Sequence, residues 1–262
     1  LGAVRANRGI AMNGRLGGRI DAFDMNLAAR SPLLTVGSLP LNSLNATASL
    51  KGLPGRPSAT LKAAAAMNGQ PASLDIRAAT TGGSIQLQDG LLQLPGTTLR
   101  ADGDLAFDGP AFTGKAELRS TDLRPLGRAL DLDLAGKASV QAVLSVEKET
   151  QAVRFEGRGE ALDIRGTTVG RADLKGDTAF PGPLRETDMQ VDLADVAHAP
   201  LRADHLNARL SGSGDGLEVR LDLREDSTKT LLKAHGMLEK DFGRALLDST
   251  HGTLLGHELR LE

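Results

Sequence analysis

Apolar and polar residues alternate along most of this chain with a period of two. The intervening positions are mostly Asp, Arg, Lys, Glu, Gln and Ser. Because successive side chains of a β-strand point to opposite faces, the alternation predicts strands with one apolar face and one polar face. The clearest windows, given by their apolar positions, are Phe23/Met25/Leu27, Leu99/Ala101/Gly103/Leu105/Phe107, Leu130/Leu132/Leu134, Val140/Ala142/Leu144/Val146, Met189/Val191/Leu193, Leu206/Ala208/Leu210 and Leu217/Val219/Leu221/Leu223.

Short turn signals separate these windows. They are Asp89-Gly90, Asp108-Gly109-Pro110, Pro181-Gly182-Pro183 and the Gly-rich stretch from Ser211 to Gly216. Such links supply the positive φ that tight hairpins need, so we expect consecutive antiparallel strands. A spacing of roughly 8–12 residues per strand predicts on the order of twenty strands.

Helical signals are few and short. Thr121 to Leu130 begins with capping residues and predicts one or two helical turns, and Lys240 to Leu247 is a second candidate. Neither segment is long enough to cover an extended sheet. An amphipathic sheet without covering helices must curl on itself, pair with another sheet, or leave its apolar face for a ligand.

The composition favours some structures and excludes several classes of function. The 262 residues include no Trp, no Tyr and six Phe, and this scarcity of large aromatic side chains favours a thin or elongated structure. The formal charge is −2, with both signs interspersed, which argues against a nucleic-acid partner. The absence of Cys excludes disulfides, thiolate metal sites and a Cys nucleophile.

Apolar runs such as Ala63 to Met67 are far shorter than the roughly 20 residues of a spanning helix. The chain begins at Leu1 with neither an initiator Met nor a signal peptide. We therefore expect a stretch of a longer protein whose membrane anchor lies outside the sequence.

Candidate chemical groups all have plainer interpretations. The pairs His251/His257 and His198/His205 are too widely spaced to share a metal on a strand, so we interpret them as exposed or turn residues. Asp102, Asp104 and Asp108 lack the spacing of a calcium loop and are interpreted as the polar face of a strand ending in a hairpin. We predict no catalytic residue, cofactor site or metal site.

Two stretches carry a resemblance to a known family. One runs from Leu99 through Gly109 and continues at Phe112–Leu118 and Ser120–Leu126, and the other comprises Leu162–Gly166 and Val169–Gly176. This texture of short strands and glycine turns resembles the AsmA-like superfamily, and its TamB branch in particular. The likeness extends over residues 1–262, with a weak strand-turn-strand repeat and no clear internal boundary.

The resemblance implies an all-β fold in which a long antiparallel sheet curls lengthwise into an open groove with an apolar interior, a β-taco. It implies a periplasmic protein tethered to the inner membrane, outside this segment, that conducts phospholipid or another acyl-chain lipid toward the outer membrane. It also implies a BamA-like outer-membrane barrel as partner, and the alternative function is a scaffold for outer-membrane protein assembly by β-augmentation.

The expected lining of the groove follows from the alternating windows. From periodicity alone, the same residues suit the packed core of a sandwich or barrel better than an open groove, and a repeat adhesin with a filled interior is a third interpretation. The scarcity of aromatic residues, the lack of covering helices and the resemblance favour the open groove. The predicted lipid-lining residues are Leu99, Ala101, Leu105, Phe107, Leu130, Leu132, Leu134, Val140, Leu144, Val146, Met189, Val191, Leu193, Leu206, Leu210, Leu217, Val219, Leu221 and Leu223.

Overall fold

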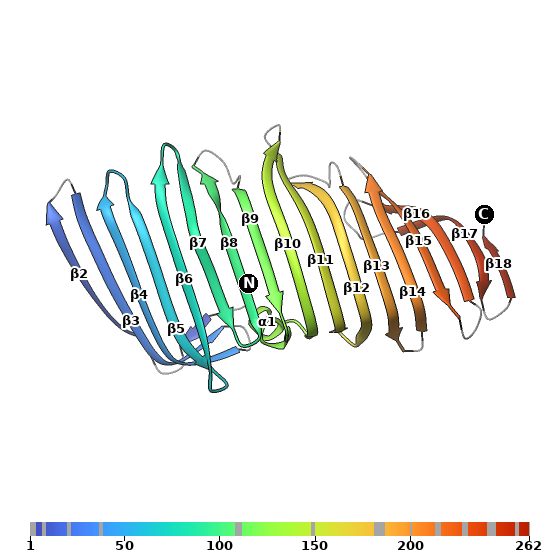
Figure 1. Ribbon diagram of the computed structural model, residues 1–262, viewed down its shortest axis with the longest axis horizontal. Coiled ribbons are helices and arrows are strands. Elements are labelled where there is room, and N and C mark those ends of the chain that lie inside the picture. The colour runs from blue at the N-terminus through green and yellow to red at the C-terminus, as the bar shows by residue number, and fades with distance from the viewer. Residues whose placement is uncertain are drawn as a thin grey trace. The chain divides into compact units, whose positions relative to one another are not determined.

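The computed structural model describes residues 4–6, 9–19, 22–36, 39–107, 112–147, 150–180, 187–199, 201–212, 216–226, 230–239, 245–254 and 257–261. The chain divides into two compact units, residues 1–135 and 136–262, and each unit is described by itself. Both units consist of long strands lying side by side in an antiparallel sheet (Figure 1). The all-β prediction, with only a short helical segment, is therefore confirmed.

Unit 1 contains nine strands and one helix among its described residues. Each strand from β2 to β8 pairs with its successor in sequence, and β1 also pairs with β3. The elements are β1 (Val4–Ala6), β2 (Ala11–Arg19), β3 (Ala22–Val36), β4 (Leu39–Leu53), β5 (Ser58–Met67), β6 (Gln70–Thr81), β7 (Ser84–Leu94), β8 (Thr97–Ala106), β9 (Phe112–Ser120) and α1 (Arg124–Leu130).

Unit 2 continues the same pattern without a helix in its described part. Strands β11 to β18 pair in sequence order, and Val140 of β10 lies beside Gly157 of β11. The strands are β10 (Leu134–Glu147), β11 (Thr150–Ile164), β12 (Thr167–Phe180), β13 (Thr187–His198), β14 (Leu201–Gly212), β15 (Gly216–Glu225), β16 (Thr230–Glu239), β17 (Ala245–Leu254) and β18 (His257–Leu261).

The strand registers place apolar residues on one face of the sheet and polar residues on the other. Residues paired directly across antiparallel strands point to the same side of the sheet. In unit 1 one such row crosses eight strands as Met12–Ala29–Ala46–Ala63–Leu74–Leu92–Leu99–Leu118. In unit 2 a polar row on the opposite face from the leucines runs Arg158–Asp173–Asp192–Asn207–Asp222–Lys233.

The sheet has no second layer among the described residues. Extensive contacts join only strands that are neighbours in the sheet, and α1 with β4. Buried apolar side chains are correspondingly few in this part of the chain: Met67, Ala72, Leu123, Val169, Ala172 and Ala203. The packed core of a two-sheet sandwich is therefore not observed.

Several strands bend along their length (Figure 1). In unit 1, register shifts occur in β4 near Ser43 and in β7 near Asp89, and both residues have positive φ, 55° and 53°. Such bulges bend a strand and increase its twist. They supply the curvature that an open, uncovered sheet needs.

Three local predictions were wrong. Asp89-Gly90 does not end a strand but forms the bulge inside β7. The described part of the second helical candidate, residues 245–247, lies in β17, whereas residues 240–244 are outside the described part. Leu130 ends α1 and Leu132 precedes β10, because the Pro125-containing segment forms a helix where alternation predicted a strand.

The remaining turn signals are partly described. The first helical candidate is confirmed by α1. Ser211 and Gly212 end β14 and Gly216 begins β15. Asp108–Pro110, Pro181–Pro183 and residues 213–215 lie outside the described part of the chain.

Candidate ligand-binding face

One face of unit 2 is apolar across the strands β11 to β16. Three parallel rows run perpendicular to the strands and carry Leu, Val, Met, Phe, Ala and Gly. The upper row is Phe155–Gly176–Met189–Leu210–Val219–Gly236, the middle row is Gly157–Leu174–Val191–Ala208–Leu221–Ala234, and the lower row is Gly159–Ala172–Leu193–Leu206–Leu223–Leu232.

The large side chains of these rows are half-buried rather than buried. Leu174, Val191, Leu206, Leu210 and Leu221 all retain part of their surface. Their partial burial comes from neighbours on the same face, because no described element packs over unit 2. We call this surface, with its three rows, the apolar face of unit 2.

The row beyond the upper row is mixed: Val153 in β11 pairs with Thr178 in β12, and both Thr178 and Thr187 are buried. Thr178 and Thr187 are paired across β12 and β13, and their hydroxyl oxygens lie 3.0 Å apart in a hydrogen bond. Gln151 follows in β11 on the same face, and its amide donates to the carbonyl of Ser145 at 2.9 Å.

The side beyond the lower row is closed by apolar residues. Leu162, Val169, Val196 and Ala203 are directly paired across β11 to β14, and Val169 and Ala203 are 5% and 4% exposed. A Cβ added at Gly159 would lie 2.6 Å from a methyl carbon of Leu162, so Leu162 folds over the lower row. We call these four residues the lip.

Backbone conformation explains how the lip forms. Strict alternation from Gly159 would send Leu162 to the opposite face. The intervening Ala161 has φ of 48° and Asp195 in β13 has φ of 54°, a left-handed conformation that breaks the alternation in both strands. The lip therefore turns its side chains toward the apolar face.

Unit 1 has an equivalent apolar face, which is partly covered. Its rows are rich in alanine, as in the segment Ala29–Ala46–Ala63. At one end, Ala129 of α1 packs on Met67 and Ala72, together with Leu41 and Leu94. The helix therefore closes one end of this face in unit 1.

Glycines on the apolar faces lie beneath neighbouring large side chains. A Cβ at Gly103 would lie 2.6 Å from Cζ of Phe112, and one at Gly176 would lie 2.8 Å from Cγ of Met189. Aromatic and aliphatic groups that cover strand glycines in this way level the surface of a sheet. A flat apolar surface makes more complete contact with a flexible hydrocarbon chain than with a rigid partner that has protruding side chains.

Most predicted lining residues lie on these two faces. In unit 1 they are Leu99, Ala101 and Leu105, and in unit 2 they are Met189, Val191, Leu193, Leu206, Leu210, Val219, Leu221 and Leu223. Val140 contacts the position of Gly157 at 3.2 Å, which places Val140 beside the middle row. Leu144 and Val146 continue the alternation from Val140 along β10, and Val146 is 41% exposed.

Five predicted lining residues are not placed on a described face. Phe107 follows the end of β8 and is 60% exposed, and Leu130 and Leu132 belong to α1 and the link after it. Leu134 is the first residue of β10 and contacts the position of Gly127 under α1, with its Cβ 3.1 Å away. The side chain of Leu217 in β15 is outside the described part of the structure.

The sequence reasoning missed Leu174 and Leu232 of the apolar face of unit 2, and two further groups of face residues. Leu61, Leu74 and Leu92 sit in strands where alanines interrupt the pattern of large residues, so alternation was hard to see. Leu162 and Val169 were missed because the phase of the alternation reverses at Ala161. The available signal was that the inward positions change from odd-numbered to even-numbered residues before the Arg165-Gly166 turn.

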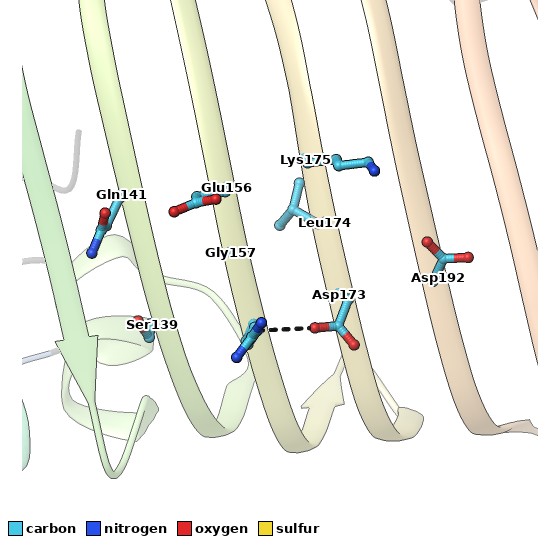
Figure 2. A pocket seen from close by; sticks show the side chains of 9 residues that line it. Ser139, Gln141, Glu156, Gly157, Asp173, Leu174, Lys175 and Asp192 are labelled. Carbon is cyan, nitrogen blue, oxygen red and sulfur yellow. Dashed lines mark ion pairs between the residues drawn. The ribbon is translucent and has the colours of Figure 1, made fainter.

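The polar face of unit 2 carries a shallow depression of about 440 Å³ (Figure 2). Charges of both signs line it, and Arg158 pairs with Asp173 at 3.3 Å. Nearby, Arg209 binds both carboxylate oxygens of Asp188, at 3.1 and 2.8 Å, which lowers the pKa of Asp188. Positive and negative side chains alternate and pair on this face, so neither sign of charge accumulates there and the ion pairs do not indicate an ion-binding site.

Candidate metal and catalytic groups remain apart in the described residues. His198 bonds to the hydroxyl of Thr167 at 3.0 Å, and His205 pairs with Ala194 on the polar face. Asp102 and Asp104 lie exposed on β8, as predicted, whereas Asp108 is outside the described part. No group of three metal-ligating side chains occurs in the described part of the chain, nor does any helix there suffice to span a membrane.

Comparison with known proteins yields no relative. No protein-family model, no curated protein and no solved structure matches this chain.

Proposed function

We propose that this chain is a segment of an envelope lipid-transfer protein whose apolar faces carry the acyl chains of phospholipid through the periplasm. The observation that supports this proposal most directly is the set of three uncovered apolar rows in unit 2. The AsmA-like texture of the sequence supports the same assignment.

The energetics favour a hydrocarbon ligand on such a surface. Each methylene removed from water contributes about 0.8 kcal/mol, so a single acyl chain gains several kcal/mol by lying across the rows. The contact needs no directional bond. Successive strands present similar rows, so a bound chain meets equivalent sites as it moves along the sheet, and the ion-paired opposite face keeps the sheet hydrated.

The test is a comparison of lipid recovered with the purified chain. Native protein should carry phospholipid detectable by mass spectrometry, and Leu221→Arg, in the middle row, should lose most of it because the charge must stay hydrated. Leu61→Arg is the equivalent change in unit 1. Native protein free of lipid after purification from membranes would contradict the proposal.

A matched control lies on the opposite face of the neighbouring strand. Asn207 is half-buried on the polar face, where its amide donates to Asp192, and it is paired between Asp192 and Asp222, so Asn207→Arg adds the same charge in an acidic setting. This variant should retain native lipid. Equal loss in Asn207→Arg and Leu221→Arg would mean that charge, rather than disruption of the apolar face, removes the lipid.

One observation favours a second candidate, a scaffold that binds partner strands by β-augmentation. All nine residues of β2 are exposed, including Met12 at 68% and Leu16 at 70%, and β2 pairs with β3 alone among the described strands. An exposed strand edge is a template for pairing with another chain. Met12→Lys with Leu16→Lys should abolish strand capture while leaving lipid binding by unit 2 intact.

A further inference from the structure

The first strands of unit 1 carry an excess of positive charge. Residues 1–69 contain eight of the 31 Arg and Lys residues but only two of the 33 Asp and Glu residues. This segment therefore has a formal charge of +6 and the remainder one of −8, within the total of −2. It includes β2 to β5, which lie side by side in the sheet (Figure 1).

Four of these basic side chains are exposed on the polar face of unit 1. On each strand the basic residue alternates with residues of the apolar rows, so its side chain points to the opposite side of the sheet. The four are Arg15 of β2, Arg30 of β3, Lys51 of β4 and Lys62 of β5. We call them the basic surface.

The basic surface has few acidic partners. Lys62 pairs with Asp75 of β6 at 2.9 Å, and Asp24 accepts a hydrogen bond from the backbone N–H of Gly52 at 3.1 Å. The other three basic residues form no ion pair with any residue in the described ranges of the chain. The polar face of unit 2 differs, because its charges are paired across the strands.

A shallow depression of about 570 Å³ lies on the basic surface. Arg15 and Lys62 line it, together with the amides of Asn13 and Asn26 and three hydroxyl side chains, and none of its lining residues is acidic. Guanidinium, ammonium, amide and hydroxyl groups all donate hydrogen bonds to phosphate oxygens. The depression on unit 2, by contrast, is lined by both signs of charge.

Large apolar side chains are exposed in the same part of unit 1. Ile10, Met12 and Leu16 are 48%, 68% and 70% exposed, and the last two belong to β2, the strand of Arg15. An acidic protein would satisfy the basic residues but offers no hydrocarbon to these side chains. Segments that bind at the surface of an anionic bilayer combine exposed apolar side chains with Lys and Arg in this way.

The spacing of the strands allows all the unpaired charges to act on one membrane. Neighbouring strands are about 4.8 Å apart, so β4 lies roughly 10 Å from β2. The potential of a charged surface extends over a Debye length of about 8–10 Å at moderate salt. With β2 at the bilayer, Arg15, Arg30 and Lys51 thus remain within reach of the lipid phosphates.

We propose that unit 1 docks on an anionic phospholipid bilayer through β2, with Ile10, Met12 and Leu16 in contact with the acyl region and the basic surface in contact with the head groups. This inference rests on the proposed function, because a lipid carrier must meet a membrane to exchange lipid. Met12 begins the apolar row of unit 1 that crosses eight strands, so a lipid that leaves the bilayer there meets this row directly.

The test is flotation of the full chain with vesicles of phosphatidylcholine alone or of phosphatidylcholine mixed with phosphatidylglycerol. Native protein should bind the mixed vesicles, and salt should weaken the binding. The triple variant Arg15→Gln, Arg30→Gln, Lys51→Gln should bind them on the order of 100-fold more weakly, because each basic residue near an anionic surface contributes about fivefold. Circular dichroism verifies that the variants are folded.

A matched triple variant removes the same charge from the polar face of unit 2. Arg154→Gln, Arg158→Gln, Lys233→Gln replaces residues that are paired with carboxylates, and it should bind mixed vesicles as native protein does. Equal losses in the two triple variants would show that net charge alone governs binding and would overturn the docking surface. Met12→Ser with Leu16→Ser should weaken binding without removing its salt dependence.

Binding of native protein to neutral and mixed vesicles alike, or to neither, also overturns the docking. In the second case an acidic protein becomes the partner of the basic surface. Phospholipid recovered by mass spectrometry from the same native sample separates this inference from the proposed function. Lipid-loaded protein that binds no vesicles contradicts the docking alone, whereas lipid-free protein that binds no vesicles contradicts both.

Discussion

At the scale of single residues, glycine is used where an uncovered sheet must stay level. Gly103 and Gly114 are paired between β8 and β9, and Phe112 lies over both positions. A methyl group at either site would push against the ring or the neighbouring backbone. Because no described element forms a second layer that could adjust on that side, the strain falls on the sheet itself.

Gly103→Ala should therefore lower the free energy of unfolding of unit 1 by about 1–3 kcal/mol, as overpacking does in tightly packed sites. Gly17→Ala in β2 is the matched control, since a Cβ there meets nothing within 4 Å, and it should change stability by less than about 0.5 kcal/mol. Urea denaturation of the two variants checks this. A Gly103→Ala protein as stable as Gly17→Ala would show that both the ring of Phe112 and the backbone of β9 shift freely.

The ion-paired face carries a pH dependence at Asp188. Hydrogen bonding to Arg209, opposed by burial, lowers the pKa of Asp188 below its ordinary value of 3.8. The folded state thus binds this proton less readily than the unfolded state. The resulting stabilisation is present above the ordinary pKa and is lost as pH falls through the lowered pKa of the folded state.

Asp188→Asn should consequently shift the urea midpoint downward at neutral pH, and this shift should shrink as pH falls below the ordinary pKa of the carboxyl group. Arg209→Gln removes the same pair from the other side and should show the same trend. Urea midpoints at neutral pH and at about pH 3 test both variants. A shift that is independent of pH would indicate that the pair acts through packing alone.

At the scale of elements, α1 is the one described segment that covers an apolar face. Pro125 lies in its first turn, and Asp131, with φ of 59°, caps its C-terminus. Leu123, just before the helix, is 4% exposed, whereas Leu130 at the end is 45% exposed. Leu123 is therefore the buried apolar side chain at the N-terminal side of the helix, and Ala129 adds the contact with Met67 and Ala72 near its C-terminal end.

Leu123→Ala should destabilise unit 1 by about 2–4 kcal/mol through loss of a buried side chain. Leu130→Ala should be nearly neutral because its side chain is largely in water. Thermal or urea unfolding of the two variants provides the comparison. Equal losses of stability in the two variants would mean that Leu123 is not the buried side chain that attaches α1.

At the scale of each whole unit, stability is distributed along the sheet. Every strand contacts mainly its hydrogen-bonded neighbours, as repeats do in a solenoid. Interior strands such as β12 to β14 have two partners, and β2 pairs with β3 alone among the described strands. Opening of the structure should therefore begin at such a strand and progress inward.

Hydrogen exchange should reveal that gradient. Amides of β2 should exchange fastest among the paired strands of unit 1, and those of β4 to β6 should be slower because both edges of each are hydrogen-bonded. In unit 2, β12 to β14 should be the most protected. Uniform protection across either unit would instead indicate one cooperative block.

Alternation in the sequence determined the fold class and the choice of face for most strands, because side-chain direction in a strand depends only on local backbone geometry. Leu206, Leu210 and Leu221 lie on the predicted face for that reason. The same local rule misassigned Leu130 and Leu132, where a proline-containing segment forms a helix.

Tertiary structure alone decided which apolar faces remain uncovered and where they end. Burial of a face depends on contacts between segments distant in sequence, and such contacts leave no period in the chain. The lip arises where positive φ at Ala161 and Asp195 reverses the side-chain direction. The sequence did not predict these conformations, because glycine adopts positive φ more readily than Ala or Asp. The four residues of the lip come together only once neighbouring strands are in register.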